Sequence, residues 1–190
     1  RFAQNGTVAV EFALVVILFF TLVFGIIEIA RIMYMYNTLA EVTRSAARAA
    51  ANIDFADAAA LDTARQRAVF RNSPGVLPFG DPITDQHIRI DYLSLARQSS
   101  GAITMTPISA GFLPNCPSQN RHNCLADPYG GSCIRLVRVR VCNNPSGAEC
   151  DSVQYQTLFP FTNLGVALPT STTIVSAETL GYRPGDPLCP

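Results

Sequence analysis

The side chains with the greatest capacity for chemistry in this chain are its cysteines and histidines. The six cysteines all lie within the last 75 residues, at Cys116, Cys124, Cys133, Cys142, Cys150 and Cys189. Seven or eight residues separate neighbours among the first five, so the Cys-x-x-Cys spacing of a zinc site is missing, and only His87 and His122 could assist. An even number of cysteines favours disulfide bonds, with free thiols and a metal site as the alternatives.

The pairing of these cysteines stays open, because six cysteines allow many connectivities. The simplest pairs are local ones, Cys116 with Cys124 and Cys142 with Cys150. Cys189 lies one residue before the last position, and a disulfide there would tie the tail to the rest of the domain.

Catalytic interpretations of the same region are less favourable. His122 lies two residues before Cys124, as in a Cys/His nucleophile, but half of a disulfide explains that cysteine better. His87, two residues after Asp85, is typical of a hydrogen-bonded residue at a strand end. Carboxylates in the loops, several of them next to Pro or Gly, fit turns better than a calcium site: Asp81, Asp85, Asp127, Asp151 and Asp186. We therefore expect no enzyme activity, no cofactor and no metal.

A membrane-spanning helix is predicted near the start of the chain. The twenty residues from Val8 to Ile27 are apolar except for Glu11, Thr21 and Gly25, which suffices to cross a hydrocarbon core of about 30 Å. A charge at the bilayer centre costs about 2.5–3.5 kcal/mol, so Glu11 is expected to have a partner. The apolar run is too long for an ordinary secretory signal, so we expect the helix to be retained.

The residues around Glu11 form a motif. Gly6-Thr7-Val8-Ala9-Val10-Glu11-Phe12 resembles the class III signal of type IV pilins, and the order of residues 6–50 resembles the TadE-like minor pilins of the tight-adherence (Flp) pilus. The resemblance implies that a prepilin peptidase cuts after Gly6 and that Thr7 begins the mature chain. It also implies that Glu11, followed by Phe12, pairs with the amino group of Thr7 in a neighbouring subunit.

The predicted helix continues beyond the membrane. Apolar residues recur every three or four positions: Ile32, Met35, Leu39, Val42, Ala46, Ala49 and Ile53. Glu28 and Arg31 are expected to form an exposed pair just outside the membrane, and Tyr34 and Tyr36 to lie at its interface. Capping residues at 54–57 precede a second helix, with Leu61, Ala64 and Ala68 on one face.

Alternating residues predict strands over residues 87–95, 133–142, 153–159 and 172–182, with 133–142 paired to 153–159. Residues 98–131 are expected to form a long, disulfide-linked loop. The predicted fold class is α+β: a long N-terminal transmembrane helix, a second helix and a small antiparallel sheet linked by disulfides. The expected domains are a cytoplasmic leader remnant (1–6), the transmembrane helix continuing into the periplasm (7–53) and a periplasmic pilin-like domain (54–190).

Charge composition limits the possible partners. Beyond residue 31 the chain carries twelve arginines and twelve acidic residues, so nucleic acid is not an expected partner. All fourteen basic residues are arginine, which excludes lysine chemistry, including isopeptide links between subunits. Cysteines on one side of a membrane segment indicate an oxidising compartment, most simply a bacterial periplasm.

The sequence therefore predicts a minor pilin that is anchored in the bacterial inner membrane and later becomes part of an extracellular pilus. Its expected partners are the inner membrane, a prepilin peptidase, and other pilins that contact its N-terminal helix. Its expected role is in pilus initiation or the tip complex and in surface adhesion. The alternatives are a membrane-anchored periplasmic binding or sensor domain and, less compatible with the missing catalytic motifs, an anchored hydrolase.

Overall fold

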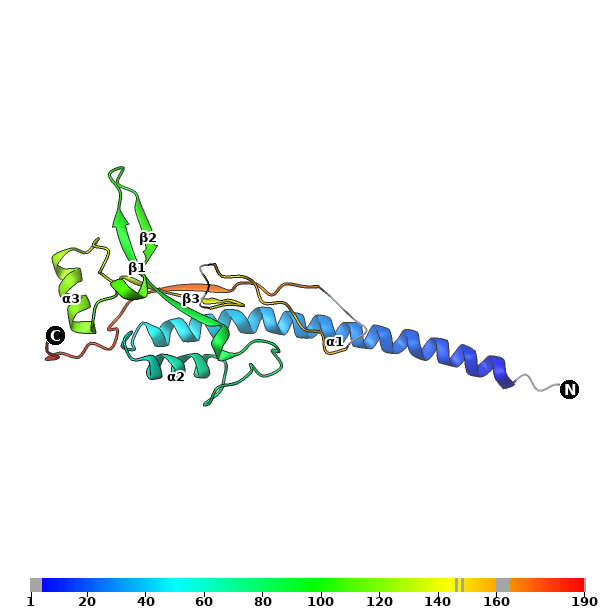
Figure 1. The fold of residues 1–190 in the computed structure, drawn as a ribbon. Coiled ribbons are helices and arrows are strands. Elements are labelled where there is room, and N and C mark those ends of the chain that lie inside the picture. Colours follow the sequence, from blue (N-terminus) through cyan, green and yellow to red (C-terminus); the bar gives the residue numbers. More distant parts are fainter. Residues whose placement is uncertain (1–4, 146, 148, 160–164, 190) are drawn as a thin grey trace.

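The computed structural model describes residues 5–145, 147, 149–159 and 165–189, with only the backbone of residues 5 and 6. Its dominant element is the helix α1 (Asn5–Ala50), whose 46 residues extend about 69 Å. The first half of α1 projects from the molecule, and the second half lies lengthwise within the folded domain (Figure 1). Helix α1 thus belongs to two environments.

The second half of α1 forms the centre of the hydrophobic core. Met35, Leu39, Val42 and Ala46 are fully buried, as the three- and four-residue spacing of the sequence predicted. They pack against α2 (Ala58–Ala68), β3 (Leu136–Val141) and β4 (Thr172–Ser176). The apolar stripe beyond the membrane is therefore covered by the protein's own domain.

Helix α2 also follows its sequence signals. The side chain of Asp57 caps its N-terminus by accepting a hydrogen bond from the backbone N–H of Ala60 at 3.0 Å. Leu61, Ala64 and Ala68 are buried on one face. The expected second helix is confirmed.

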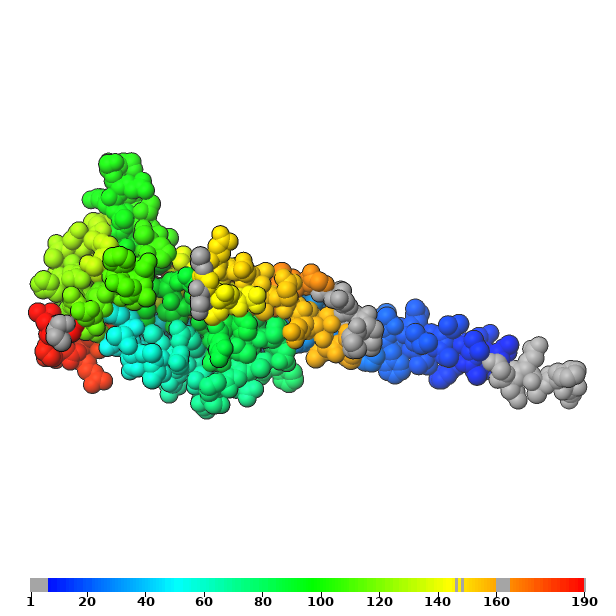
Figure 2. Space-filling model, viewed as in Figure 1, coloured from blue at the N-terminus to red at the C-terminus, as the bar shows by residue number. Residues whose placement is uncertain are grey.

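A four-stranded antiparallel sheet covers the other side of α1. Its strand order is β2-β1-β3-β4, with β1 at Ile88–Arg97 and β2 at Ile103–Pro107. Three valines of the central strand β3, Val137, Val139 and Val141, are buried. The β1–β2 hairpin projects from the body of the molecule (Figure 2). The α+β fold class is confirmed. Strands β3 and β4 lie within predicted segments, and β1 begins in the predicted segment 87–95 and extends two residues beyond it.

The region from 98 to 131 is not the long loop that the sequence suggested. It contains β2, the short 3₁₀ helix η2 (Ala110–Phe112) and the helix α3 (Pro117–Ala126); a further 3₁₀ helix, η1 (Asp85–His87), precedes β1. Strand β2 is exposed along nearly its whole length, so it lacks the alternation of a half-buried strand. Helix α3 has no apolar stripe for the same reason: it is polar nearly all round.

The predicted strand at residues 153–159 is wrong. The strands paired with β3 are β1 and β4, and residues 153–159 form only an isolated bridge, from Gln154 to Ala167. Val153 and Tyr155 are buried, which explains the alternating pattern in the sequence. Burial on one side produced a strand-like pattern in a segment that does not belong to the sheet.

The cysteines form three disulfides, Cys116–Cys189, Cys124–Cys133 and Cys142–Cys150. The local pair Cys142–Cys150 is therefore present, whereas the expected pair Cys116–Cys124 is not. Cys116 caps α3 and Cys124 lies eight residues later on the same helix, about 12 Å along its axis. That separation exceeds the reach of a disulfide. Cys189 fixes the C-terminal tail to the start of α3.

Candidate functional site

The motif residues lie on the projecting half of α1. Thr7, Glu11 and Phe12 are exposed, with Phe12 at 70% of its full accessibility. Thr7 and Glu11 are four residues apart and therefore share one face of the helix, whereas Phe12 points about 100° away from Glu11. Gly6 is part of the first helical turn. The structure thus presents the motif at the free end of a helix.

The projecting half is covered with exposed apolar side chains. The large ones include Leu14, Ile17, Leu18, Phe19, Leu22 and Ile26, each more than half exposed. Within the described residues, α1 is the one helix long and apolar enough to cross a membrane. Water is an unfavourable solvent for this surface, which accounts for membrane anchoring by α1.

The boundary between the two halves of α1 is formed by a buried charged residue, Glu28. The sequence placed this acid in an exposed pair with Arg31, and that interpretation is wrong because Glu28 is 1% and Arg31 8% exposed. The carboxylate of Glu28 accepts hydrogen bonds from the Tyr155 hydroxyl and from the backbone N–H groups of Leu158 (2.6 Å) and Phe159 (3.1 Å). Glu28 therefore holds the segment 155–159 against α1.

Arg31, one helical turn later, binds two segments at once. Its guanidinium donates to the backbone oxygens of Phe79 (3.0 Å), Asp81 (3.1 Å) and Gln156 (2.6 Å). It also lies over the ring of Tyr155, 5.0 Å from the ring centroid. We call Glu28, Arg31 and Tyr155 the membrane-exit cluster.

The membrane-exit cluster satisfies both buried charges. A buried ion is tolerated when hydrogen bonds and an opposite charge replace its lost hydration, and both conditions hold here. The tyrosines expected at the membrane interface also bind this part of the domain: Tyr34 donates to the Pro78 oxygen and Tyr36 to the Ala167 oxygen. Phe24 and Phe159 add a ring contact at 4.4 Å. Hydrogen bonds and one aromatic ring contact thus fix the domain to α1.

Two of the residues considered for catalysis, Cys124 and His87, make structural contacts. Cys124 is bonded to Cys133, and His122 is exposed. Nδ1 of His87 accepts a hydrogen bond from the backbone N–H of Thr84 at 3.0 Å, and burial lowers the pKa of this histidine. In the described part of the chain, no three His, Cys, Asp or Glu side chains lie close enough to hold a metal ion.

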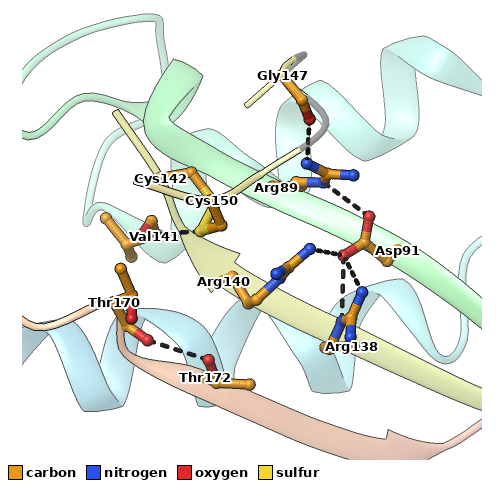
Figure 3. The surroundings of a disulfide bond; sticks show 10 residues. All are labelled: Arg89, Asp91, Arg138, Arg140, Val141, Cys142, Gly147, Cys150, Thr170 and Thr172. Carbon is orange, nitrogen blue, oxygen red and sulfur yellow. Dashed lines mark hydrogen bonds and ion pairs between the residues drawn. A yellow bond between two sulfur atoms is a disulfide. The ribbon is translucent and has the colours of Figure 1, made fainter. Parts of the chain in front are cut away.

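A second charged cluster lies on the face of the sheet that is turned away from α1 (Figure 3). Asp91 on β1 binds Arg89 (2.8 Å) on the same strand and Arg138 (3.0 Å) and Arg140 (2.7 Å) on β3. Next to it, the Cys142–Cys150 disulfide closes a loop whose Gly147 oxygen accepts from Arg89. The sequence showed these charges only as the outward side of two strands.

Burial would raise the pKa of Asp91, but the hydrogen bonds from Arg89, Arg140 and Arg138 outweigh it and lower the pKa below its usual value. Three guanidinium groups surround one carboxylate, so the cluster carries a net charge of plus two. We call Asp91 with these three arginines the arginine cluster.

Comparison with known protein families finds a match for the N-terminal segment. Residues 6–48 match the family model described as TadE-like protein. The resemblance to TadE-like proteins is confirmed. No curated protein and no solved structure matches the chain significantly.

The TadE-like segment contains the motif at Gly6–Phe12, the projecting half of α1 and the membrane-exit residues Glu28 and Arg31. It ends two residues before α1 does. TadE-like proteins form a structural, non-enzymatic family associated with the Tad pilus. The match stops at residue 48, so the sheet, α3 and the disulfides lie outside it.

The membrane-exit cluster leads to a stability prediction. Replacing Arg31 with Met removes the positive charge one turn from the buried Glu28 carboxylate and the donor to three backbone oxygens, so we expect the free energy of unfolding to fall by about 3 kcal/mol. The matched control is Arg44→Met, because Arg44 pairs with Glu41 at the same three-residue spacing on α1 but is exposed. This control should cost less than about 0.5 kcal/mol.

Denaturation of the full chain in detergent micelles, followed by tyrosine fluorescence, measures both changes. Equal stability of the two variants would contradict the role of the membrane-exit cluster.

The arginine cluster leads to a pH prediction. Because the pKa of Asp91 is lower in the folded protein than the usual 3.8, its stabilisation is complete above that pH and is lost as the pH falls below it. Asp91→Asn should be less stable than the wild type at about pH 5, and the difference should shrink toward about pH 2. Unfolding midpoints across this range test the idea, and parallel curves for the two proteins would count against it.

Proposed function

We propose that this chain is a minor pilin subunit of a Tad/Flp type IV pilus. In this proposal a prepilin peptidase cleaves after Gly6, and the subunit then assembles through α1. It acts in pilus initiation or in the tip complex and contributes to surface adhesion. The observation that carries the proposal is the projecting half of α1, with Glu11 among exposed apolar side chains, within a segment that matches the TadE-like family.

The charge of Glu11 supplies the specificity of assembly. In the membrane a lone carboxylate is costly, and its cost falls when a cation is buried with it. Cleavage after Gly6 would create such a cation at the amino group of Thr7. Because Thr7 and Glu11 share one helix face, a staggered neighbour would bring its own Thr7 amino group to Glu11 of this subunit. Phe12, on a different side of α1, would then contact apolar side chains of adjacent helices.

The apolar surface of the projecting half of α1 supplies the contacts that would drive assembly. The projecting helix is exposed to lipid before assembly and to other pilin helices afterwards, so it fits both environments. The proposed partners are therefore the inner membrane, the prepilin peptidase and other pilins or minor pilins, reached through α1. The three disulfides agree with a periplasmic domain that later becomes extracellular as part of the pilus.

A membrane-anchored periplasmic binding or sensor domain is the alternative function. A groove beside β1, lined by α2, η1 and residues 107–113, favours this alternative function. In that case α1 would be a passive anchor, and the chain would keep its residues before Thr7.

The mature N-terminus separates the two functions. Mass spectrometry of the protein purified from membranes of its natural host should find a chain that begins at Thr7, because the peptidase removes all residues up to Gly6. A chain that retains Arg1–Gly6 in cells that make working pili would contradict the proposal and support the sensor function.

Glu11 can be tested directly. Glu11→Leu should leave the protein folded and membrane-inserted, since a leucine is favourable in lipid, but should abolish its incorporation into pili. Glu41→Leu is the matched control, because Glu41 is an exposed acid on the same helix beyond the membrane.

Immunoblots of sheared pili and of membranes measure incorporation and total protein. Normal incorporation of the Glu11 variant would count against assembly through this charge.

A further inference from the structure

The sheet has an open edge along the first half of β1. Strand β2 pairs with β1 only from Leu93 to Arg97, and the next backbone contact joins the Ile108 N–H to the Tyr92 oxygen at 2.9 Å. On its other side β1 pairs with β3 along its whole first half, from Ile88 to Leu93. Residues 88–92 therefore have a strand neighbour on one side alone.

Backbone hydrogen-bonding groups face this open edge. In an antiparallel pair alternate residues bond to the same neighbour, and the bond from Cys142 N–H to the His87 oxygen fixes this alternation. The backbone N–H and C=O groups of residues 87, 89 and 91 thus point toward β3. Those of Ile88, Ile90 and Tyr92 point toward the open edge. Ile88 N–H is used by the Asp85 oxygen. No other hydrogen bond within the described residues uses the Ile88 oxygen, the Tyr92 N–H or either backbone group of Ile90.

The open edge runs along a groove of about 660 Å³. One wall is formed by α2 and η1, and the other by the segment from Pro107 to Leu113. Tyr92 lines the groove and is 6% exposed, and its hydroxyl has no hydrogen-bond partner within the described residues. Burial raises the pKa of Tyr92, so the hydroxyl keeps its proton. It is a buried donor that lacks an acceptor.

The arginine cluster gives the β1 side of this groove an excess of positive charge. On the opposite wall the lining acid Asp62 pairs with Arg65, and the buried Asp85 accepts the Gly75 N–H at 2.9 Å, so the positive excess lies on the outward face of β1. Arg89 and Asp91 line the groove from the outward face of β1, and the cluster around them has an excess of two positive charges (Figure 3). Its side chains are only 19–22% exposed for the arginines and 10% for the aspartate. Half-buried cations with too few carboxylates attract a further carboxylate.

We propose that the edge of β1 from Ile88 to Tyr92 binds an extended, acidic segment of a partner protein as an added strand. The partner's backbone would bond to Ile88, Ile90 and Tyr92 in the place that β2 occupies farther along β1. Its outward carboxylates would meet Arg89, and an inward polar side chain would accept the Tyr92 hydroxyl proton. This interaction is independent of how α1 assembles.

Three capped hexapeptides test the proposal with the full chain in detergent micelles. The first alternates Glu and Thr, the second replaces Glu with Lys, and the third is the Glu peptide with N-methyl groups on the backbone nitrogens of one edge. Only the first should bind saturably, and the other two should bind at least about tenfold more weakly, because one lacks the charge and the other lacks backbone donors.

Amide hydrogen exchange locates the binding. The Glu peptide should slow exchange in the fragment that covers residues 88–92 and leave β4 unchanged. Equal binding of all three peptides, or binding of none, would overturn the proposal. Protection of residues 88–92 that grows with protein concentration in the absence of peptide would also overturn it, because a second copy would then occupy the edge.

Two variants separate binding from folding. Tyr92→Phe removes only the unpartnered hydroxyl, so the free protein should remain as stable as the wild type while affinity for the Glu peptide falls several-fold. Arg89→Gln should weaken the same peptide about tenfold, whereas Arg97→Gln, at the far end of β1, should not. Unchanged affinity in both the Tyr92 and the Arg89 variants would overturn the proposed site.

Discussion

The whole molecule depends on one helix whose two halves must be stable in different environments, an apolar exterior and a protein core. The first half of α1 exposes apolar side chains all round, and the second half presents one stripe to a protein core. The change occurs at Glu28 and Arg31, whose charges would be costly in lipid and unsatisfied in a dry core. Glu28 accepts hydrogen bonds from Tyr155 and from the backbone of residues 158 and 159, and Arg31 donates to the backbone oxygens of residues 79, 81 and 156, which resolves this conflict. The same contacts determine where the domain begins along the helix.

The sequence predicted best where one physical signal dominated. The apolar run from Val8 to Ile27, the stripe from Met35 to Ala46 and the cap at Asp57 each depend on local chemistry, and each is present in the structure. The valines of β3 alternate because one face of the strand is buried against α1. These elements could be predicted because their burial is visible along the chain.

The remaining elements depend on contacts between residues far apart in sequence. Glu28 appeared exposed because its partner, Tyr155, lies 127 residues away. The alternation of Val153 and Tyr155 reflected burial against α1 rather than membership of the sheet. Strand β2 lacked a pattern because it is exposed along nearly its whole length, and helix α3 because the side chains it buries include the polar residues Ser118 and Asn120. The pairing of Cys116 with Cys189, 73 residues apart, was likewise outside the reach of local spacing. Glu11 and Phe12 were identified instead from the resemblance of residues 6–12 to a pilin signal, and both are exposed on the projecting half of α1.

The lengthwise placement of α1 has a mechanical consequence. Because the helix lies along the domain and is held at one end by Glu28 and Arg31, a pull on its projecting half enters the domain through those hydrogen bonds. The load then spreads in shear over the side chains from Met35 to Ala50 at the same time, rather than opening contacts one after another. In the proposed pilus, the subunit would transmit tension from α1 to its sheet as a single stiff body.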